Sequence, residues 1–345
     1  MSLRYLITGG AGFIGSAVVR QLTRSPDVNV LVVDKLTYAG NLLGLVPVAK
    51  NPRYQFLCED ICNRSAMLSA LLDFKPDIIM HLAAETHVDR SIVGPADFIQ
   101  TNIVGSYILL DAALEYWKRS LNSSQENFKF HHVSTDEVFG SLEVGSFHEN
   151  SPYRPNSPYS ASKASSDHLV RAWHRTYGLP VVISNCSNNY GPYQYPDKLI
   201  PYVIRSALNG QRIPLYGDGT HRRDWLYVDD HVRALCVVAR RGRVGESYNI
   251  GGNSEIDNLS LVVQICSLLD ELAPSSRSQR YRDLISFVQD RPGHDFRYSV
   301  STDKIANELG WHPQDSLVTG LRKTVIWYLE HRSWLDEMPP PCEPV

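Results

Sequence analysis

A strand that runs into a glycine-rich turn constrains the fold of this chain more than any other feature. Residues 5–15 read YLITGGAGFIG, in which a short apolar run meets Gly9, Gly12 and Gly15 before a helical pattern, SAVVRQL. Glycine permits a tight turn at such a junction. Further β-rich runs are expected to be strands at 28–34, 54–57, 77–84, 128–134 and 179–185, and the clearest helix is expected at 99–117. Strands and helices in alternation predict an α/β fold, a doubly wound parallel sheet with helices on both faces.

The regular alternation ends near residue 185. Proline, glycine and asparagine then punctuate segments such as NNYGPYQYPDK and YGDGTHRRDW. We therefore expect a sheet domain over 1–182, to which 224–250 returns, and a smaller, irregular α/β domain over 183–223 and 251–335 that closes over the sheet. The proline-rich end, 336–345, is expected to be a tail.

Composition excludes several kinds of partner. The 34 Lys and Arg residues nearly balance the 37 Asp and Glu residues, and the formal net charge is -3. The chain has no basic footprint for nucleic acid or an anionic membrane, no apolar run of membrane-spanning length and no signal-peptide pattern, so we expect a soluble, cytoplasmic protein. The six cysteines are scattered, which favours reduced thiols. Cys58 and Cys62 lack a second pair at zinc spacing, and no metal site is expected.

The glycine turn and the end of the second strand together predict a dinucleotide site. Glycines let the backbone approach a pyrophosphate, whose charge is met by the N–H groups at the start of the following helix. The second strand ends at Asp34, where a carboxylate would accept hydrogen bonds from a ribose diol and repel a 2′-phosphate. This predicts a Rossmann-type domain that prefers NAD to NADP. Lys35 weakens that preference, since its charge would suit a phosphate, and Asp60 follows the third strand, where it would meet the adenine or be a solvated turn residue.

Tyr159 and Lys163 lie four residues apart in a helical pattern, so both side chains can point into one site. A free tyrosine, with a pKa of about 10, is a poor base near neutral pH. A lysine ammonium beside it, with an oxidised nicotinamide, would favour the phenolate. We therefore expect this pair to remove the proton of a hydroxyl group while the carbon that bears it is oxidised. A solvated helical pair is the alternative.

The segment STDEVFG places Thr135, Asp136 and Glu137 at the carboxyl end of a strand, the edge at which open α/β sheets bind ligands. Thr135 can hydrogen-bond a substrate hydroxyl. Alcohol oxidation alone has no use for adjacent carboxyls, whereas two carboxyls in one crevice titrate apart and can act as acid and base. That suits the loss of water. Acids stabilised at a helix N-terminus are the alternative.

These residues, with the motifs DKLTYAGN, HLAAETHVDRS, SPYSASKASSDHLVRAW, SNNYGPYQYPDKLIP, GDGTHRRDWLYVDDH, YNIGG and DRPGHDFRY, resemble the extended short-chain dehydrogenase/reductase family, and within it the nucleotide-sugar 4,6-dehydratases. The resemblance implies oxidation of dTDP-D-glucose at C4 by Tyr159, elimination of water across C5 and C6 by Glu137 and Asp136, and return of the hydride to C6. The product would be dTDP-4-keto-6-deoxy-D-glucose, with NAD+ regenerated. A homodimer is also implied, and the apolar helix at 99–117 could supply its interface.

The resemblance also implies two sets of binding residues. Those for the cofactor are Gly9, Gly12, Phe13, Ile14, Gly15, Asp34, Lys35, Thr37, Asp60, Ile61, Leu82, Ala83, Ala84, Tyr159, Lys163 and Asn188. Those for the nucleotide sugar are Thr86, His87, Asn188, Lys198, Leu199, Pro201, Pro214, Tyr216, Arg223, Asn258, Arg291, His294 and Tyr298. Arginine suits the diphosphate because a guanidinium binds phosphate bidentately.

Three other functions remain compatible with the sequence. A 4-epimerase would use Tyr159 and Lys163 but would have no step for Asp136 and Glu137. A related 4,6-dehydratase that acts on a UDP- or GDP-sugar is a second alternative. A binding protein that merely carries NAD would have no need of the complete set, and a single turnover would exclude it.

Overall fold

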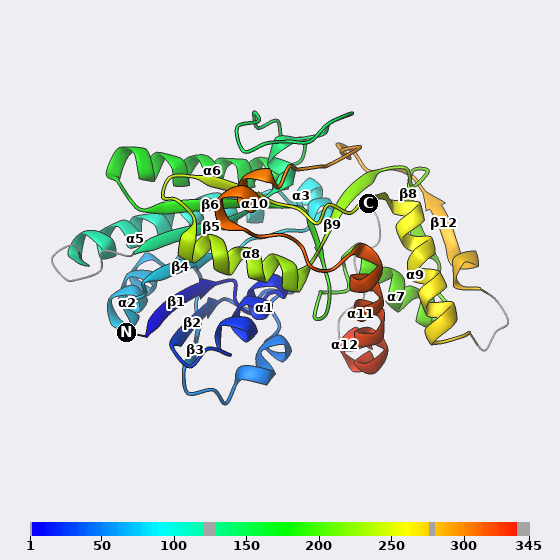
Figure 1. Cartoon of the computed structure of the whole chain (residues 1–345), viewed down its shortest axis with the longest axis horizontal. Helices are drawn as coiled ribbons and strands as arrows, with labels where there is room; N and C mark the ends of the chain where they lie inside the picture. Colours follow the sequence, from blue (N-terminus) through cyan, green and yellow to red (C-terminus); the bar gives the residue numbers. More distant parts are fainter. Residues whose placement is uncertain (1, 121–127, 276–279, 337–345) are drawn as a thin grey trace.

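The computed structural model describes residues 2–120, 128–275 and 280–336, so the tail expected at 336–345 lies, apart from its first residue, outside the described residues. Its centre is a parallel sheet of seven strands within those ranges, in the order β10-β6-β5-β4-β1-β2-β3. The strands are β1 Leu3–Thr8, β2 Val28–Asp34, β3 Tyr54–Cys58, β4 Ile78–His81, β5 Lys129–Thr135, β6 Val181–Cys186 and β10 Ser247–Ile250. The expected doubly wound α/β fold is confirmed (Figure 1).

Alternate residues of each strand enter the cores on opposite faces of the sheet. In β2, Val30 and Val32 pack in one core, and Leu31 and Val33 pack in the other. Helices cover the two faces, as Figure 1 shows. One face carries α1 Phe13–Leu22, α8 Val228–Arg241 and α10 Asp303–Leu309. The opposite face carries α2 Arg64–Phe74, α5 Ser106–Ser120 and α6 Pro158–Tyr177. Because alternate strand residues are buried on opposite faces, helices pack on both, and the domain has three layers: helices, sheet and helices.

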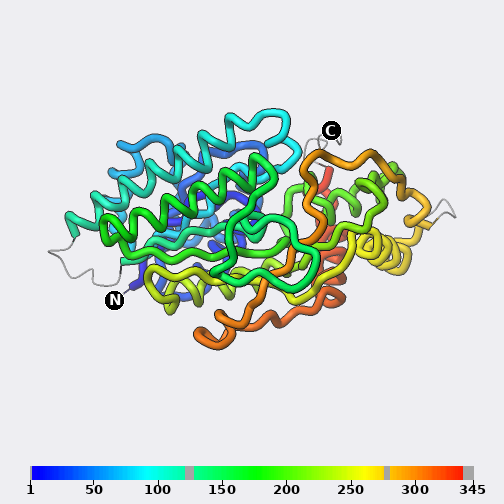
Figure 2. Tube along the Cα trace, turned by 90° about the horizontal axis from the view of Figure 1, so that it is seen from above, coloured from blue at the N-terminus to red at the C-terminus, as the bar shows by residue number. Residues whose placement is uncertain are grey.

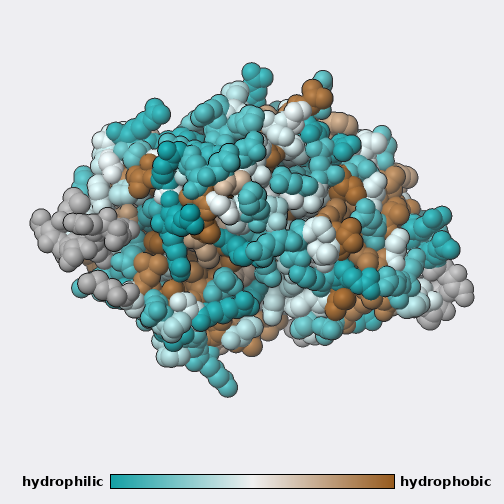
Figure 3. Space-filling model, viewed as in Figure 1, coloured by the Kyte–Doolittle hydropathy of each residue, from teal (hydrophilic) through white to brown (hydrophobic). Residues whose placement is uncertain are grey.

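A second part of the chain lies beside the sheet domain, as Figure 2 shows, and has its own apolar core. Its strands form two small sheets, β11-β9-β7 and β12-β8. They are β7 Asn188–Tyr190, β8 Ile213–Tyr216, β9 Arg222–Tyr227, β11 Glu255–Asp257 and β12 Ile285–Val288. The helices here are α7 Leu199–Leu208, α9 Asn258–Leu272, α11 Leu317–Glu330 and α12 Arg332–Asp336. The face of the molecule seen in Figure 3 is mostly hydrophilic, with hydrophobic residues in small groups.

The segment expected to be one helix at 99–117 contains a change of helical type. It comprises α4 Ala96–Phe98, a π-helical stretch η2 Ile99–Gly105, and α5. Inside the π-helical stretch, the Asn102 side chain accepts from Glu85 N at 2.9 Å and donates to Glu85 O at 3.0 Å. It also donates to Ser162 Oγ at 2.8 Å. The wider helix thus ties the loop after β4 to α6.

The remaining short elements connect these layers. They are the 3₁₀ turns η1 Leu42–Val48, η3 Asp136–Phe139 and η4 Tyr281–Leu284, and the short helix α3 Val88–Val93. None of the helices in the described ranges is long and apolar enough to cross a membrane.

Candidate active site

Two adjoining cavities lie along the carboxyl edge of the central sheet. The first has a volume of about 350 Å³ and the second about 230 Å³. Seven residues line both and mark where they meet, namely Thr86, Glu137, Asn188, Asp197, Lys198, Leu199 and Trp225. The first cavity extends under the ends of β1, β2 and β4, and the second extends into the smaller part of the chain. A long ligand can therefore occupy both, with its middle near Glu137.

The glycine turn forms one end of the first cavity. Gly9 has a φ of +70°, and a Cβ there would lie 2.6 Å from Ala83 N. A Cβ on Gly15 would lie 2.1 Å from Gly9 O, so the turn can close only if residue 15 has no side chain. Helix α1 begins after Gly12 without a side-chain cap, and its first turn holds no acidic residue. Its free N–H groups at the cavity wall fit a pyrophosphate.

Asp34 ends β2 at the wall of the first cavity. Its two carboxylate oxygens accept from Ala11 N and Leu36 N, each at 2.9 Å. Burial raises the pKa of Asp34, against the effect of those two hydrogen bonds. Lys35 Nζ lies 3.3 Å from Asp60 Oδ2, so its charge is paired with a carboxylate and does not stand alone beside Asp34. Asp34 therefore fits a ribose diol better than a ribose phosphate.

Tyr159 and Lys163 lie in the first two turns of α6 and are both buried. Ser157 caps this helix through a capping box with Ser160, and Pro158 occupies the first position, which fixes where the helix starts. Lys163 Nζ donates to Val133 O at 2.9 Å. Burial lowers the pKa of Lys163, and the nearby Asp167 carboxylate opposes that shift.

That Lys163 and an oxidised nicotinamide together favour the Tyr159 phenolate stays a prediction, and the protein's own groups shift the pKa of Tyr159 in the other direction. Burial and then the Glu137 carboxylate raise the pKa of Tyr159 well above its ordinary value, although the Thr135 hydroxyl hydrogen-bonds the phenol and opposes the rise. Lys163 points at a backbone carbonyl. A phenolate here therefore needs a further positive charge in the first cavity.

Asp136 and Glu137 are turned into the protein and not into solvent. They form the start of η3 directly after β5, and Asp136 is 1% exposed. Its Oδ1 accepts from Thr135 Oγ1 at 3.3 Å, while its buried Oδ2 has no hydrogen-bond partner among the described residues. Burial, followed by the charges of Glu137 and Asp224, raises the pKa of Asp136 well above its ordinary value.

Glu137 has a different electrostatic environment. Burial raises its pKa as well, but the charges of Arg291, Arg223 and Lys198 oppose the rise. Both pKa values are raised, but more positive charges oppose the rise at Glu137 than at Asp136, which is the direction in which an acid and a base would differ. Both line the first cavity, and Glu137 lines the second as well.

Charged and aromatic side chains line the second cavity. Arg291 Nη1 lies 2.8 Å from Asp89 Oδ1, and the Tyr216 hydroxyl donates to Asp89 Oδ2 at 3.0 Å. Arg223 is 5% exposed, and it donates to Asp295 O at 2.8 Å while stacking on Tyr298. These two fixed guanidinium groups suit an anionic ligand such as a diphosphate.

Every residue predicted for the cofactor lines the first cavity, and those predicted for the sugar nucleotide line the second, with the exception of Pro201. Pro201 lies on α7 two positions after Leu199 and is buried. Two helical positions correspond to a rotation of about 200°, so Leu199 faces the cavities and Pro201 faces the core.

Sequence reasoning missed several lining residues, of which Asp197 is the clearest. Its carboxylate lies between the two cavities, and neither oxygen has a hydrogen-bond partner within the part of the chain that the structure describes. The nearest base, His87 Nε2, is 3.7 Å away, and burial lowers the pKa of His87 to about 4. Asp197 directly precedes Lys198 in the motif YPDKLIP. Its position beside a predicted binding residue was the feature of the sequence that could have indicated it. Tyr38, Glu85 and Trp225 also line the cavities and were missed, although each lies in one of the motifs quoted above.

The sheet, the glycine turn and the buried tyrosine, lysine and paired carboxyls define a Rossmann-type enzyme that acts on nucleotide-linked sugars. Residues 6–324 match the family described as GDP-mannose 4,6 dehydratase, and the chain belongs to this family.

Its relatives agree with that assignment. The chain is 54% identical over 346 aligned residues to the dTDP-glucose 4,6-dehydratase of Shigella flexneri, covering 97% of this chain and 95% of the relative. It is 58% identical over 335 residues to that of Neisseria meningitidis serogroup B, covering 96% and 94%.

Solved structures show the same architecture. DesIV, a dTDP-glucose 4,6-dehydratase from Streptomyces venezuelae crystallised with NAD, superposes with a TM-score of 0.89 at 46% identity, covering 98% of this chain and all of that one. UDP-glucuronic acid 4-epimerase from Bacillus cereus, in complex with UDP-glucuronic acid and NAD, gives a TM-score of 0.83 at 28% identity, covering 95% and 99%. The chain is thus more similar in sequence to the dehydratase than to the epimerase.

Proposed function

We propose that this chain is an NAD-dependent hydro-lyase that converts dTDP-D-glucose into dTDP-4-keto-6-deoxy-D-glucose. The observation that carries the proposal is the pair of carboxyls with raised pKa values, Asp136 and Glu137, which line the first cavity together with Tyr159. The names of the relatives support the same substrate and reaction.

The first cavity would hold NAD. The free N–H groups at the start of α1 would bind the pyrophosphate, Asp34 the adenosine ribose, and Asp60 the adenine side. When bound, NAD+ supplies a positively charged hydride acceptor that is restored in every cycle. The remaining cofactor residues named above would line its path, and the structure of DesIV with NAD supports this assignment.

Tyr159 would act on the hydroxyl at C4 of the glucose. Its phenolate takes the hydroxyl proton while C4 becomes a carbonyl, and the Thr135 hydroxyl, which hydrogen-bonds the phenol, orients the same hydroxyl. Lys163 contributes positive charge on the buried side of the helix and is kept in place by the Val133 carbonyl. The C4 carbonyl then makes the hydrogen on C5 acidic.

Glu137 and Asp136 would then remove water. Glu137 takes the proton from C5, the electron pair forms the C5–C6 double bond, and the C6–O bond breaks. Asp136 gives its proton to the departing hydroxyl, which leaves as water. In the return step, C6 receives the hydride and C5 receives a proton from Glu137, so the hexose loses one water in all and the cofactor is unchanged. Exchange with solvent then removes the proton that Tyr159 took and replaces the one that Asp136 gave, which restores both residues.

The second cavity would bind the nucleoside diphosphate. Arg223 and Arg291 would meet the diphosphate, while the other second-cavity residues named above, Pro201 excepted, would surround the sugar and the base. We further propose that 1–182 and 224–250 form the cofactor domain and that 183–223 and 251–335 form the substrate domain. The chain would be cytoplasmic, in keeping with its cysteine use.

We also propose that the chain forms a homodimer through α5, α6 and η2. Ile99 is 51% exposed, Tyr107 46% and Tyr177 46%. The rings of Tyr107, Trp173 and Tyr177 contact one another in series along α5 and α6. This apolar surface, which we call the aromatic face, could be shared by two copies related by a two-fold axis.

The test is to incubate the enzyme with dTDP-glucose, UDP-glucose and GDP-mannose separately and to record the ultraviolet band that 4-keto sugars develop in alkali. We expect the band with dTDP-glucose at the highest rate. A higher rate with either other sugar would assign another nucleobase. Formation of a C4 epimer without the band would replace the dehydratase by an epimerase, and no turnover with any sugar would leave a binding protein.

A further inference from the structure

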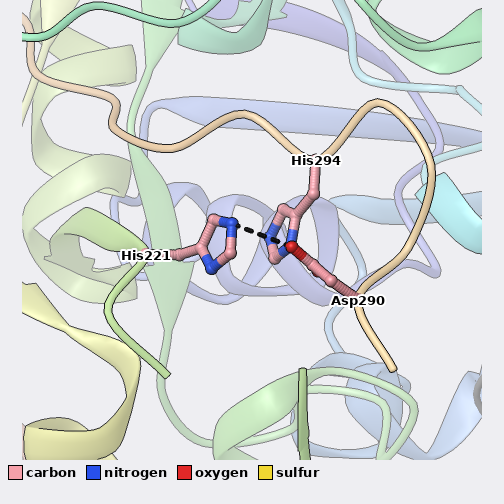
Figure 4. A group of neighbouring side chains, drawn as sticks. All are labelled: His221, Asp290 and His294. Carbon is pink, nitrogen blue, oxygen red and sulfur yellow. Dashed lines mark hydrogen bonds and ion pairs between the residues drawn. The ribbon is translucent and has the colours of Figure 1, made fainter. Parts of the chain in front are cut away.

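Three side chains from two distant segments converge at the rim of the second cavity. His221 directly precedes β9, and Asp290 and His294 lie in the loop after β12. Figure 4 shows both imidazole rings beside the Asp290 carboxylate. His294 Nδ1 lies 2.7 Å from Asp290 Oδ1, and His221 Nε2 lies 3.3 Å from Asp290 Oδ2. The proposed reaction gives His221 and Asp290 no task.

We propose that His221, Asp290 and His294 form a binding site for a divalent transition-metal ion such as Zn²⁺ or Co²⁺. Two imidazole nitrogens and one carboxylate oxygen are a ligand set that these ions prefer, and a fourth position remains for water. The inference does not depend on the proposed function, because it concerns binding of the ion by itself.

The distances allow coordination after a small movement. One ligand atom from each of the three side chains lies within 4.8 Å of the other two. Around a tetrahedral Zn²⁺, ligand atoms are separated by about 3.3 Å, so the cluster must contract by at most about 1.5 Å. The two rings are stacked with centroids 3.8 Å apart. A rotation of His221 about its side-chain bonds would bring its Nε2 toward the ion.

Neighbouring charges have partners of their own. Arg291 pairs with Asp89 at 2.8 Å, and Arg223 donates to the carbonyl oxygens of Asp295 and Phe296. The side chain of Asp290 is 38% exposed, whereas those of His221 and His294 are 10% and 5% exposed. An ion can therefore enter from the side of Asp290 and be held against the two rings.

The first measurement is calorimetric titration of the purified protein with ZnCl₂, repeated with MgCl₂. We expect one Zn²⁺ per chain at micromolar concentration and no comparable heat from Mg²⁺, which prefers oxygen ligands. His221→Gln removes one ligand at a position that lines neither cavity. It should weaken Zn²⁺ binding at least about tenfold and leave metal-free turnover unchanged.

A matched control is His312→Gln, which removes an exposed histidine elsewhere and should leave Zn²⁺ binding as in the wild type. Unchanged affinity in His221→Gln, or no one-to-one binding by the wild type, would overturn the proposal. If His221→Gln does not fold, the visible absorption spectrum of the wild-type protein with Co²⁺ tests the proposal instead. Intense bands of a four- or five-coordinate ion support the site, and the weak bands of octahedral Co²⁺ contradict it.

Discussion

In the proposed mechanism, the acid role of Asp136 opposes stability at the scale of one residue. The side chain is 1% exposed and one of its oxygens lacks a hydrogen-bond partner within the described ranges. Burial raises the pKa of this carboxyl, which favours the protonated form that the proposed acid needs, but any ionisation inside the fold is costly. The burial that would make Asp136 an acid therefore also lowers the stability of the fold when the group ionises.

This predicts a pH-dependent stability difference for Asp136→Asn. The folded-state pKa of Asp136 is raised above that of the unfolded chain, so folding takes up a proton and stability is lost as pH rises from about 4 through the folded pKa. The amide cannot ionise. We expect the melting temperature of the variant, relative to the wild type, to increase between pH 5 and pH 8 while activity is lost.

Thermal unfolding of both proteins at several pH values measures this difference. Asp73→Asn, at an exposed position, is the matched control and should follow the wild type. A difference between Asp136→Asn and the wild type that is constant with pH would show that Asp136 does not carry a raised pKa.

At the scale of elements, the sequence pattern located six of the seven strands of the central sheet, because each combines β-rich composition with flanking turn residues; β10 was not predicted as a strand. The second strand was predicted at 28–34 and is observed at Val28–Asp34. Strand 77–84 was predicted too long, since β4 ends at His81 and the backbone beyond turns to line the first cavity. The π-helical stretch Ile99–Gly105 had no local signal, and its Asn102 side chain bonds to Glu85, which is 17 residues away.

The residues of the site also differ in whether the sequence could predict them. Residues within one motif, such as Tyr159 and Lys163, follow from helical spacing alone. Pro201 was misplaced because a linear motif does not show which helical face meets the cavity. His221 and Asp290 come from segments far apart in the sequence, and the folding of the smaller part brings them together. No local pattern could have paired them.

The glycine turn supports a prediction for a single element. In Gly15→Ala, the added methyl would lie 2.1 Å from the Gly9 carbonyl oxygen, which the backbone cannot accommodate without opening the turn. We expect a loss of about 3 kcal/mol in the free energy of unfolding. NAD affinity should also fall at least tenfold. Denaturant unfolding measures the loss of stability, and calorimetric titration with NAD measures the affinity.

The matched control is Gly94→Ala, where the nearest atom would be 3.9 Å from the new methyl. That variant should bind NAD as the wild type does. Normal NAD binding by Gly15→Ala would show that the closed turn is not required for the cofactor.

At the scale of the whole molecule, the aromatic face is the expected contact between two copies. Tyr107→Asp places a charge in the middle of this surface, where the partner would bury it without a counter-ion. We expect sedimentation at micromolar concentration to give a dimer for the wild type and a monomer for the variant.

Val244→Asp, at a position that is 48% exposed and distant in sequence from this face, is the matched control and should remain dimeric. A wild-type protein that sediments as a monomer would remove the dimer proposal. A Tyr107→Asp variant that stays dimeric would move the interface to another surface.

Glu137 lines both cavities, and the central claim is that it is the base that acts at C5. Glu137→Gln keeps the shape of the side chain but cannot take a proton. With dTDP-glucose in excess, rapid mixing should show the absorbance of reduced nicotinamide rising and persisting, because C4 is oxidised while elimination is blocked. Formation of the 6-deoxy product should fall by at least about a thousandfold, or roughly 4 kcal/mol of transition-state stabilisation. Product formation at the wild-type rate would contradict the account.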